Sequence, residues 1–254
     1  MIVCKSPSEL EKMREANALV AQVLWELASV VAAGVTTAEL DAAAEKAVRA
    51  AGAEPAFKGY RGYPATLCAS INEQVVHGIP SKRPLAAGDI VSLDMGVRLK
   101  GFYGDSAITV PVGTVSDDVK TLLRVTQEAL DKGIAQVRIG GRISDIGHAI
   151  QQHVEAHGFS VVREFVGHGI GSALHEEPQI ANYGEPGRGP RLAEGMTLAI
   201  EPMVNMGKPA VRLLADGWTA VTRDGSLSAH FEHTVAVTKD GPLVMTLRPV
   251  AAGK

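Results

Sequence analysis

The spacing of apolar residues predicts a long amphipathic helix near the start of the chain. Ser6, Pro7 and Glu9 form a helix-start signal, in which Ser6 caps the first turn and Glu9 closes a capping box. Apolar residues then recur three or four positions apart on one helical face as far as Gly34. They are Leu10, Met13, Val20, Leu24, Leu27 and Val31. A second helix is predicted from about 37 to 51.

The pattern then changes to strand-like runs and returns to helices. A strand and loop region extends to Pro84, and the runs IVSLDMGV and YGDSAITV, joined by RLKG, predict an antiparallel hairpin. A turn centred between Leu99 and Lys100 would place Asp94 opposite Asp105. Helices are predicted near 117–137 and 144–157, followed by strands in VVREFVGHGI, TLAIEPMV and HFEHTVAVT, with a surface loop at NYGEPGRGPRL. Helix pairs that alternate with hairpins predict an α+β fold, in which helices cover one face of a curved antiparallel sheet.

Two segments of the chain resemble each other. AAGDIVSLD and AEGMTLAIE each place an acid six residues after a glycine, and the predicted helices end at Gly52 and Gly158, 106 positions apart. We therefore expect residues 1–254 to form a single domain with an internal repeat of about 106 residues and two pseudo-symmetric halves. The alternative is chance similarity between two short glycine-led strands, which the matching helix positions disfavour.

Composition agrees with one globular unit. The chain has 254 residues, of which 46% are hydrophobic and 21% charged, so it can bury a sizeable core. A net charge of −3 gives no electrostatic reason to expect a nucleic acid or a membrane as partner. Two cysteines, Cys4 and Cys68, are too few for a disulfide framework, and no secretory signal precedes the first helix. The apolar runs are too short for a membrane span. We expect a cytoplasmic protein.

Five side chains stand out because each lies in an apolar or glycine-rich segment, where an unpaired charge is costly. They are Asp94, Asp105, His168, Glu201 and Glu232. Two carboxylates held roughly 5 Å apart on paired strands repel each other unless a proton or a cation lies between them. The midpoint between Glu201 and Glu232 falls on Asp216 and Gly217, which are a hairpin signal. This signal predicts that Glu201 and Glu232 form a second pair of facing carboxylates. Two divalent cations would balance the four carboxylates, and this donor set favours manganese, iron or cobalt over a structural zinc site.

Six segments together resemble the type I methionine aminopeptidases, in the same order and across essentially the whole chain. They are CASINEQVVHGIP, LDMGV, GFYGDSAITV, VGHGIGSALHEEPQI, EGMTLAIEP and HFEHTVAVT. The resemblance implies the pita-bread fold and two divalent metal ions (cobalt, manganese or iron, with zinc as an alternative). It also implies removal of initiator methionine from nascent polypeptides with a small second residue, by attack of a metal-bridged hydroxide on the scissile carbonyl.

The resemblance assigns a role to each candidate residue. Asp105 and Glu232 would bridge the metals, Asp94 would hold one ion, and His168 with Glu201 would hold the other. Glu201 would also accept a proton from the attacking water. The two further histidines of the family fall on His175, which would stabilise the oxyanion, and His77, which would contact the peptide nitrogen. The methionine pocket would be lined by Phe57, Tyr60, Tyr63, Cys68, Leu174 and Trp218. The family commonly has an aromatic residue where this chain has Leu174, so we expect one softer or wider wall.

The same residues disfavour related functions. Prolidases and aminopeptidases P share the fold, but resemble larger chains with an extra N-terminal domain, for which the residues before Pro7 leave no room. A type II enzyme would need a long insertion in the second half, and the complete ligand set disfavours a metal-free binding protein. We expect a monomer that acts on nascent N-termini near ribosomes. No function is assigned to His148, His153 and His157, nor to His230 and His233 beside Glu232.

Overall fold

The computed structural model describes residues 1–247, which contain four α-helices and one short 3₁₀ turn. These are α1 (Pro7–Val30), α2 (Thr37–Ala50), η1 (Tyr60–Gly62), α3 (Asp117–Ile134) and α4 (Ile143–Ala156). The capping box predicted for α1 is present, since the Ser6 backbone N–H donates to Glu9 Oε2 at 2.7 Å. None of the described helices is both long and apolar enough to cross a membrane.

The described chain also contains 15 strands, and all of their pairings are antiparallel. The strands are β1 (Glu54–Pro55), β2 (Leu67–Ile71), β3 (Gln74–Val76), β4 (Ile90–Leu99), β5 (Phe102–Pro111), β6 (Ser160–Val161), β7 (Gly167–Gly169), β8 (Glu176–Ile180), β9 (Thr197–Ile200), β10 (Met203–Asn205), β11 (Val211–Leu213), β12 (Ala220–Thr222), β13 (Ser228–His230), β14 (Glu232–Thr238) and β15 (Gly241–Val244). The main sheet has the order β1-β4-β5-β14-β9-β7-β8, with β2 also paired to β4 and β15 to β14. Two small sheets, β13-β10-β6 and β11-β12-β3, complete the described strands.

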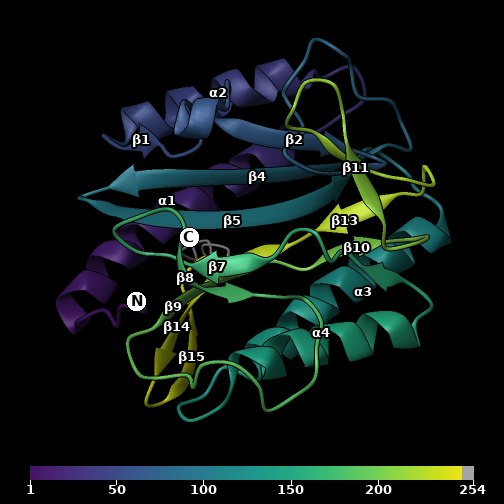
Figure 1. Ribbon diagram of the computed structural model, residues 1–254. Coiled ribbons are helices and arrows are strands. Elements are labelled where there is room, and N and C mark those ends of the chain that lie inside the picture. Colours follow the sequence, from purple (N-terminus) through teal and green to yellow (C-terminus); the bar gives the residue numbers. More distant parts are fainter. Residues whose placement is uncertain (248–254) are drawn as a thin grey trace, which may run out of the picture.

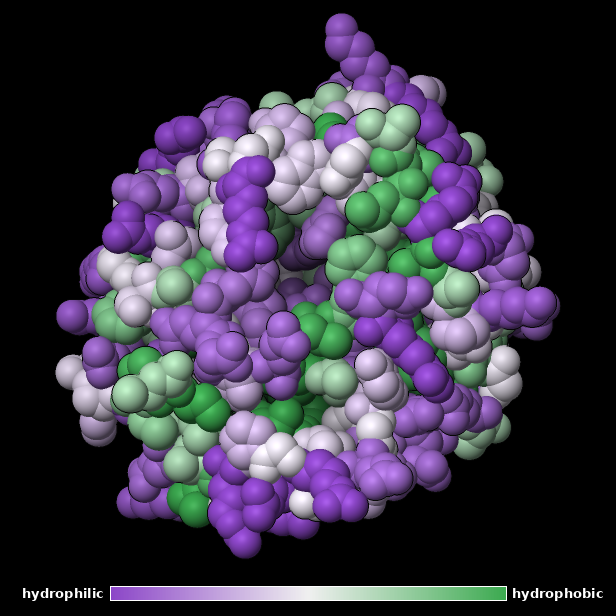
Figure 2. All heavy atoms as spheres, viewed as in Figure 1, coloured by the Kyte–Doolittle hydropathy of each residue, from purple (hydrophilic) through white to green (hydrophobic). Residues whose placement is uncertain are grey.

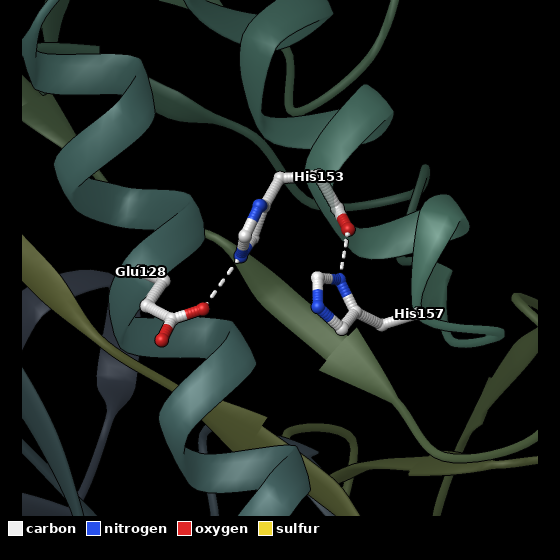
Figure 3. Close-up of side chains that lie close together, drawn as sticks. All are labelled: Glu128, His153 and His157. Carbon is white, nitrogen blue, oxygen red and sulfur yellow. Dashed lines mark hydrogen bonds and ion pairs between the residues drawn. The ribbon is translucent and has the colours of Figure 1, made fainter.

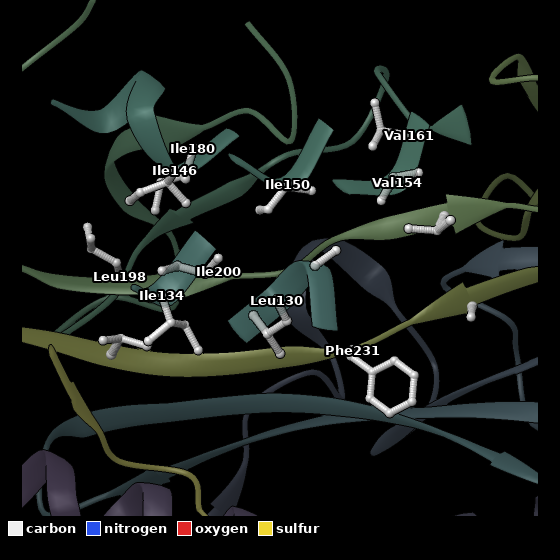
Figure 4. Close-up of a cluster of buried hydrophobic side chains, with 14 of the residues drawn as sticks. Leu130, Ile134, Ile146, Ile150, Val154, Val161, Ile180, Leu198, Ile200 and Phe231 are labelled. Atoms are coloured by element: carbon white, nitrogen blue, oxygen red, sulfur yellow. The ribbon is translucent and has the colours of Figure 1, made fainter. Parts of the chain in front are cut away.

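The helices cover the sheet in two pairs (Figure 1). Helices α1 and α2 pack on the half formed by β2, β4 and β5, whereas α3 and α4 pack on the half that contains β9 and β14. Each pair has its own apolar core. Figure 4 shows the second core, where Leu130, Ile134, Ile146 and Ile150 from the helices meet strand residues such as Leu198. This arrangement confirms the predicted α+β fold with helices on a curved antiparallel sheet.

The register of the first hairpin differs from the prediction. Asp94 pairs with Ala107, and Asp105 pairs with Gly96, so the two acids are diagonal neighbours and not direct partners. The turn consists of Lys100 and Gly101, whose φ angles of 51° and 84° are those of a two-residue primed turn. The expected centre lay one residue too early, which shifts the register by two. Because side chains alternate along a strand, a shift of two keeps both acids on one face.

The register of the second hairpin was predicted correctly. The pairs Ile200–His233, Met203–His230 and Leu213–Ala220 share one register, which centres on the turn between Asp216 and Gly217. The hairpin is long and interrupted, and the segment after β9 that contains Glu201 is one of the interruptions. In the sheet, the β4–β5 hairpin meets the β14–β9 hairpin edge to edge, through β5 and β14. Each hairpin thus contributes its second strand to this junction, and an origin of the two halves in a sequence repeat stays a prediction.

Candidate metal centre and active site

The five candidate ligands meet where the two hairpins join. Asp94 on β4, Asp105 on β5, Glu232 on β14, His168 on β7 and Glu201 just after β9 all line one cavity. The His168 Nε2 atom lies 3.6 Å from Glu201 Oε1 and 3.9 Å from Asp105 Oδ2. One donor atom from each of Asp105, His168 and Glu232 lies within 4.8 Å of the other two. Side chains that are up to 138 residues apart in sequence therefore converge on one point.

The acids in this cluster lack the partners that buried carboxylates need. Asp94 Oδ1, Asp105 Oδ1 and Glu232 Oε1 are buried without a hydrogen-bond partner in the described chain. Burial raises the pKa of Asp94 to about 7 and that of Glu201 to about 8. Burial and neighbouring carboxylates also raise the pKa values of Asp105 and Glu232. Oxygen atoms that are buried, unpartnered and mutually repelling fit divalent cations, which would satisfy the lone pairs and balance the charge.

The glycines on either side of His168 position its imidazole, which is neutral and can offer a nitrogen lone pair to a metal ion. Its Nδ1 lies 2.9 Å from the Gly169 carbonyl oxygen, which can only accept, so Nδ1 carries the hydrogen and Nε2 faces the acids with a free lone pair. Burial lowers the pKa of His168 to about 3. A Cβ on Gly169 would lie 2.2 Å from the Glu177 carbonyl oxygen, and one on Gly167 would lie 2.3 Å from that of Ala199. The strands can approach this closely only because these residues are glycines.

The two other candidate histidines lie in the same cavity. The His175 ring lies 4.3 Å from the His168 ring, centroid to centroid, and its Nδ1 is 2.9 Å from the Tyr60 hydroxyl oxygen. His77 meets Phe165 and Trp218 edge to face, with ring centroids 5.4 and 6.4 Å away. Burial lowers the pKa of His77 to about 4, and it also lowers that of His175. Both imidazoles are therefore neutral near pH 7.

The six residues predicted to form the methionine pocket line this cavity as well. It has a volume of about 210 Å³ and holds Phe57, Tyr60, Tyr63, Cys68, Leu174 and Trp218 beside the acids. The surface in Figure 2 is hollowed near its centre, where polar and apolar residues meet. Cys68 is the cross-strand partner of Asp94, and burial raises the pKa of its thiol, which keeps it protonated. Both cysteines are free.

Sequence reasoning left out several residues that the structure places here. His230 is fully buried, and its Nε2 lies 3.5 Å from Glu201 Oε2. The signal for it was its spacing of two from Glu232, since such residues share one face of an extended chain. His233 lies on the opposite face, where its Nδ1 is 2.8 Å from the Thr246 hydroxyl. The remaining unpredicted wall residues are Arg61, Val76, Phe165, Val166 and Met203.

Comparison with known proteins agrees with this geometry. The model of metallopeptidase family M24 matches residues 11–239. Methionine aminopeptidase 1 of Bacillus subtilis is 54% identical over 97% of this chain and 99% of its own length, and the Clostridium perfringens enzyme is 52% identical with the same coverage. The crystal structure of methionine aminopeptidase from Rickettsia prowazekii has a TM-score of 0.96 at 46% identity and covers 97% of this chain and 100% of that one. That from Thermotoga maritima reaches 0.95 at 48% identity, covering 97% and 99%.

More distant structures share the architecture alone. The prolidase from Pyrococcus furiosus has a TM-score of 0.78 at 21% identity, and the match covers 96% of this chain and 65% of that one. The resemblance expected from the sequence and the pita-bread fold that it implied are both confirmed. The chain belongs to metallopeptidase family M24 and, within it, to the methionine aminopeptidases.

Proposed function

We propose that this protein removes the N-terminal methionine of newly made polypeptides when the second residue is small. The observation that carries this proposal is a single cavity in which a cluster of unpartnered acids adjoins an apolar, aromatic-lined pocket. An apolar pocket beside a hydrolytic centre selects one side chain at the scissile bond. The methionine aminopeptidases that match this chain over 97% of its length support the same activity.

Members of a metallopeptidase family use divalent metal ions, and the donor set here fits two of them. Asp105 and Glu232, at the centre of the cluster, would hold them, together with Asp94 on one side and with His168 and Glu201 on the other. When bound, such ions lower the pKa of a water molecule and polarise the scissile carbonyl. Cobalt, manganese and iron suit these oxygen and nitrogen donors, with zinc as an alternative.

The proton steps belong to side chains of the protein. Glu201, which lines the cavity beside His168 and His230, takes a proton from the attacking water and returns it to the leaving amine. His175 lies at the cavity wall with Nδ1 bonded to the Tyr60 hydroxyl, so a hydroxyl that donates to Nδ1 leaves Nε2–H free to donate to the oxyanion. His77, neutral because burial lowers its pKa, contacts the peptide nitrogen.

The methionine side chain would occupy the aromatic part of the cavity. The Tyr63 hydroxyl lies 3.0 Å from the Gly78 carbonyl oxygen and 3.1 Å from that of Leu67, so its ring is fixed as a wall. Trp218 meets this ring edge-on at 5.2 Å between centroids. Aromatic edges and the Cys68 thiol are suitable neighbours for a thioether sulfur.

The location and assembly of the protein are further proposals. We place the activity in the cytoplasm, on nascent chains close to ribosomes, in a monomeric enzyme without nucleic acid or membrane partners. Free cysteines and the absence of a membrane-spanning helix among the described residues are compatible with this assignment.

A peptide assay tests the proposed reaction. Metal-loaded protein should release methionine from Met-Ala-Ser much faster than from Met-Leu or Met-Lys peptides, because a large second side chain would crowd His77 and the ligands. Cleavage of Ala-Pro peptides in place of Met-Ala-Ser would indicate a prolidase-like enzyme. Equal rates on Met-Ala and Met-Leu would indicate a broad aminopeptidase, and no metal-dependent release at all would overturn the proposal.

A further inference from the structure

Three side chains with metal-binding groups meet at the surface of the α3–α4 pair, apart from the active-site cavity. They are Glu128 on α3, His153 on α4 and His157, which caps the C-terminus of α4 (Figure 3). One donor atom from each lies within 4.8 Å of the other two. None of the three lines the described cavity that holds the acids. Their spacing in the sequence does not predict a shared site, because Glu128 is on a different helix from the histidines.

The geometry of the two imidazoles suits a shared ligand. His153 Nε2 lies 2.9 Å from Glu128 Oε2, and the two histidine rings have centroids 4.6 Å apart. His157 Nδ1 lies 2.8 Å from the His153 carbonyl oxygen, so it must donate, and Nε2 keeps its lone pair. In Figure 3 this second nitrogen is on the ring edge that faces His153 and Glu128. Metal-binding histidines are commonly oriented in this way, by a backbone carbonyl on the other ring nitrogen.

Helix packing explains why the three groups are close. Gly133 on α3 lies against Ile150 on α4, and a Cβ there would be 2.9 Å from two Ile150 side-chain atoms, so the helices approach closely. His153 and His157 are four residues apart and therefore project from the same side of α4. They also lie in its last turn, where the partial negative charge of the helix end favours a cation.

Arg124 is the existing partner of this carboxylate and does not block the site. Its Nη1 lies 2.8 Å from Glu128 Oε1 and 3.0 Å from Oε2. An ion that replaces the His153 contact at Oε2 leaves Oε1 to Arg124, which would then orient the ligating carboxylate. In a tetrahedral zinc site, each ligand atom lies about 2.0–2.1 Å from the ion, so two ligand atoms are roughly 3.3 Å apart. The distance of 2.9 Å between His153 Nε2 and Glu128 Oε2 therefore has to increase only slightly.

We propose that Glu128, His153 and His157 bind one further transition-metal ion, which ties the C-terminal end of α4 to α3. Two imidazole nitrogens and one carboxylate oxygen suit zinc, copper, nickel or cobalt, and leave the remaining coordination position to water. The site shares no residue with the catalytic centre, so the proposal does not depend on the proposed reaction.

Zinc binding tests the proposal directly. Folded protein is dialysed against micromolar free Zn²⁺, and bound zinc per chain is compared between wild type, His153→Gln and His157→Gln. His148→Gln is the matched control, because His148 lies on the same helix but contacts the Gly184 carbonyl oxygen at 3.1 Å instead of the cluster. Wild type and control should bind one zinc ion more per chain than either variant. Equal zinc content in all four proteins would overturn the proposal.

Hydrogen exchange gives a second readout that does not depend on the catalytic metals. Zn²⁺ should slow amide exchange in the last turn of α4, from 153 to 157, in wild type and in His148→Gln, but not in His157→Gln. His157 is exposed, so its replacement leaves the core intact, and circular dichroism checks that it does. Exchange that Zn²⁺ leaves unchanged in wild type would show that no ion joins the two helices.

Discussion

At the scale of single residues, Glu201 is placed to carry a proton. It lines the cavity with the other acids and lies beside both His168 and His230. We predict that Glu201→Gln lowers kcat by at least about 100-fold, the usual contribution of a general base, while the protein stays folded. Steady-state kinetics and circular dichroism check this. A variant that keeps more than about a tenth of the wild-type kcat would contradict the role, because a loss of less than about 10-fold is smaller than the contribution of a general base.

Leu174 tests how the apolar wall selects the first residue of the substrate. It is buried, it belongs to the same apolar cluster as Met13 and Ile170, and it lines the cavity. Leu174→Phe should narrow the pocket and Leu174→Ala should widen it, so their preferences among methionine, longer and branched first residues should shift in opposite directions. One methylene in such a pocket is worth about 1–3 kcal/mol. Ratios of kcat/KM for a peptide series measure this, and unchanged ratios would place Leu174 outside the pocket.

At the scale of elements, the N-terminal segment supports the loop that carries His175. The Lys5 backbone N–H donates to the Gly195 carbonyl oxygen at 2.7 Å, and its ammonium group forms a buried ion pair with Glu176. Glu176 Oε1 in turn accepts from the Ala173 backbone N–H at 3.1 Å. Lys5, near the beginning of the chain, thus fixes a loop in the second half. This loop carries Leu174 and His175, which form one wall of the cavity.

Removing one partner of this buried pair should be costly. We predict that Lys5→Met destabilises the protein by about 3–5 kcal/mol, because it leaves the Glu176 carboxylate buried without a countercharge. The double variant Lys5→Met, Glu176→Gln should recover part of that loss, since no charge then remains. Urea unfolding of the three proteins measures both effects. A double variant that is less stable than the single one would show that the charge is not the cause.

Much of this arrangement was predictable from local signals. Capping residues predicted the start of α1, and the Asp216–Gly217 turn predicted the register of a hairpin whose arms continue to Glu201 and Glu232. The predicted register of the first hairpin was wrong by two residues, because RLKG offers more than one turn position. In the structure, the positive φ angles of Lys100 and Gly101 identify these two residues as the turn. Phe165, Arg61 and the Glu128 cluster could not be found, since tertiary packing alone brings them to their neighbours.

At the scale of the molecule, the two halves meet where β5 pairs with β14, beside the four buried acids. Without cations, the carboxylates at this junction repel one another. Burial lowers the pKa values of five histidines, so well above the unfolded value of about 6.5 these side chains are neutral in both folded and unfolded chains, and the buried acids then decide the pH dependence. The five are His77, His168, His175, His230 and His233. The pKa values of the acids are raised in the fold, to about 7 for Asp94 and about 8 for Glu201, above those of the unfolded chain. The native state therefore keeps protons that the unfolded state has lost, and stability falls as pH rises.

We predict that the melting temperature of the chelated protein falls as the pH rises from about 7 to about 8, through the pKa values of Asp94 and Glu201. Added divalent metal should raise the melting temperature, because an ion that binds only the native state stabilises it. Glu201→Gln should flatten the slope of the chelated protein. Thermal unfolding with and without chelator measures these effects, and curves that chelation leaves unchanged would mean that the acids do not bind metal.

The backbone of His77 is in a strained conformation, which lowers the stability of the folded protein. Its φ angle of 60° is in the left-handed region, which costs an L-residue roughly 1–2 kcal/mol. The next residue holds it there, since the Gly78 N–H donates to Ser70 Oγ at 3.0 Å and the Gly78 carbonyl accepts from the Ala69 N–H at 2.9 Å. Glycine relieves this strain and alanine does not. His77→Gly should therefore be more stable than His77→Ala by about 1 kcal/mol, the reverse of the usual order, although both lose the imidazole. Urea unfolding decides the order, and an alanine variant at least as stable as the glycine one would show that His77 stores no strain.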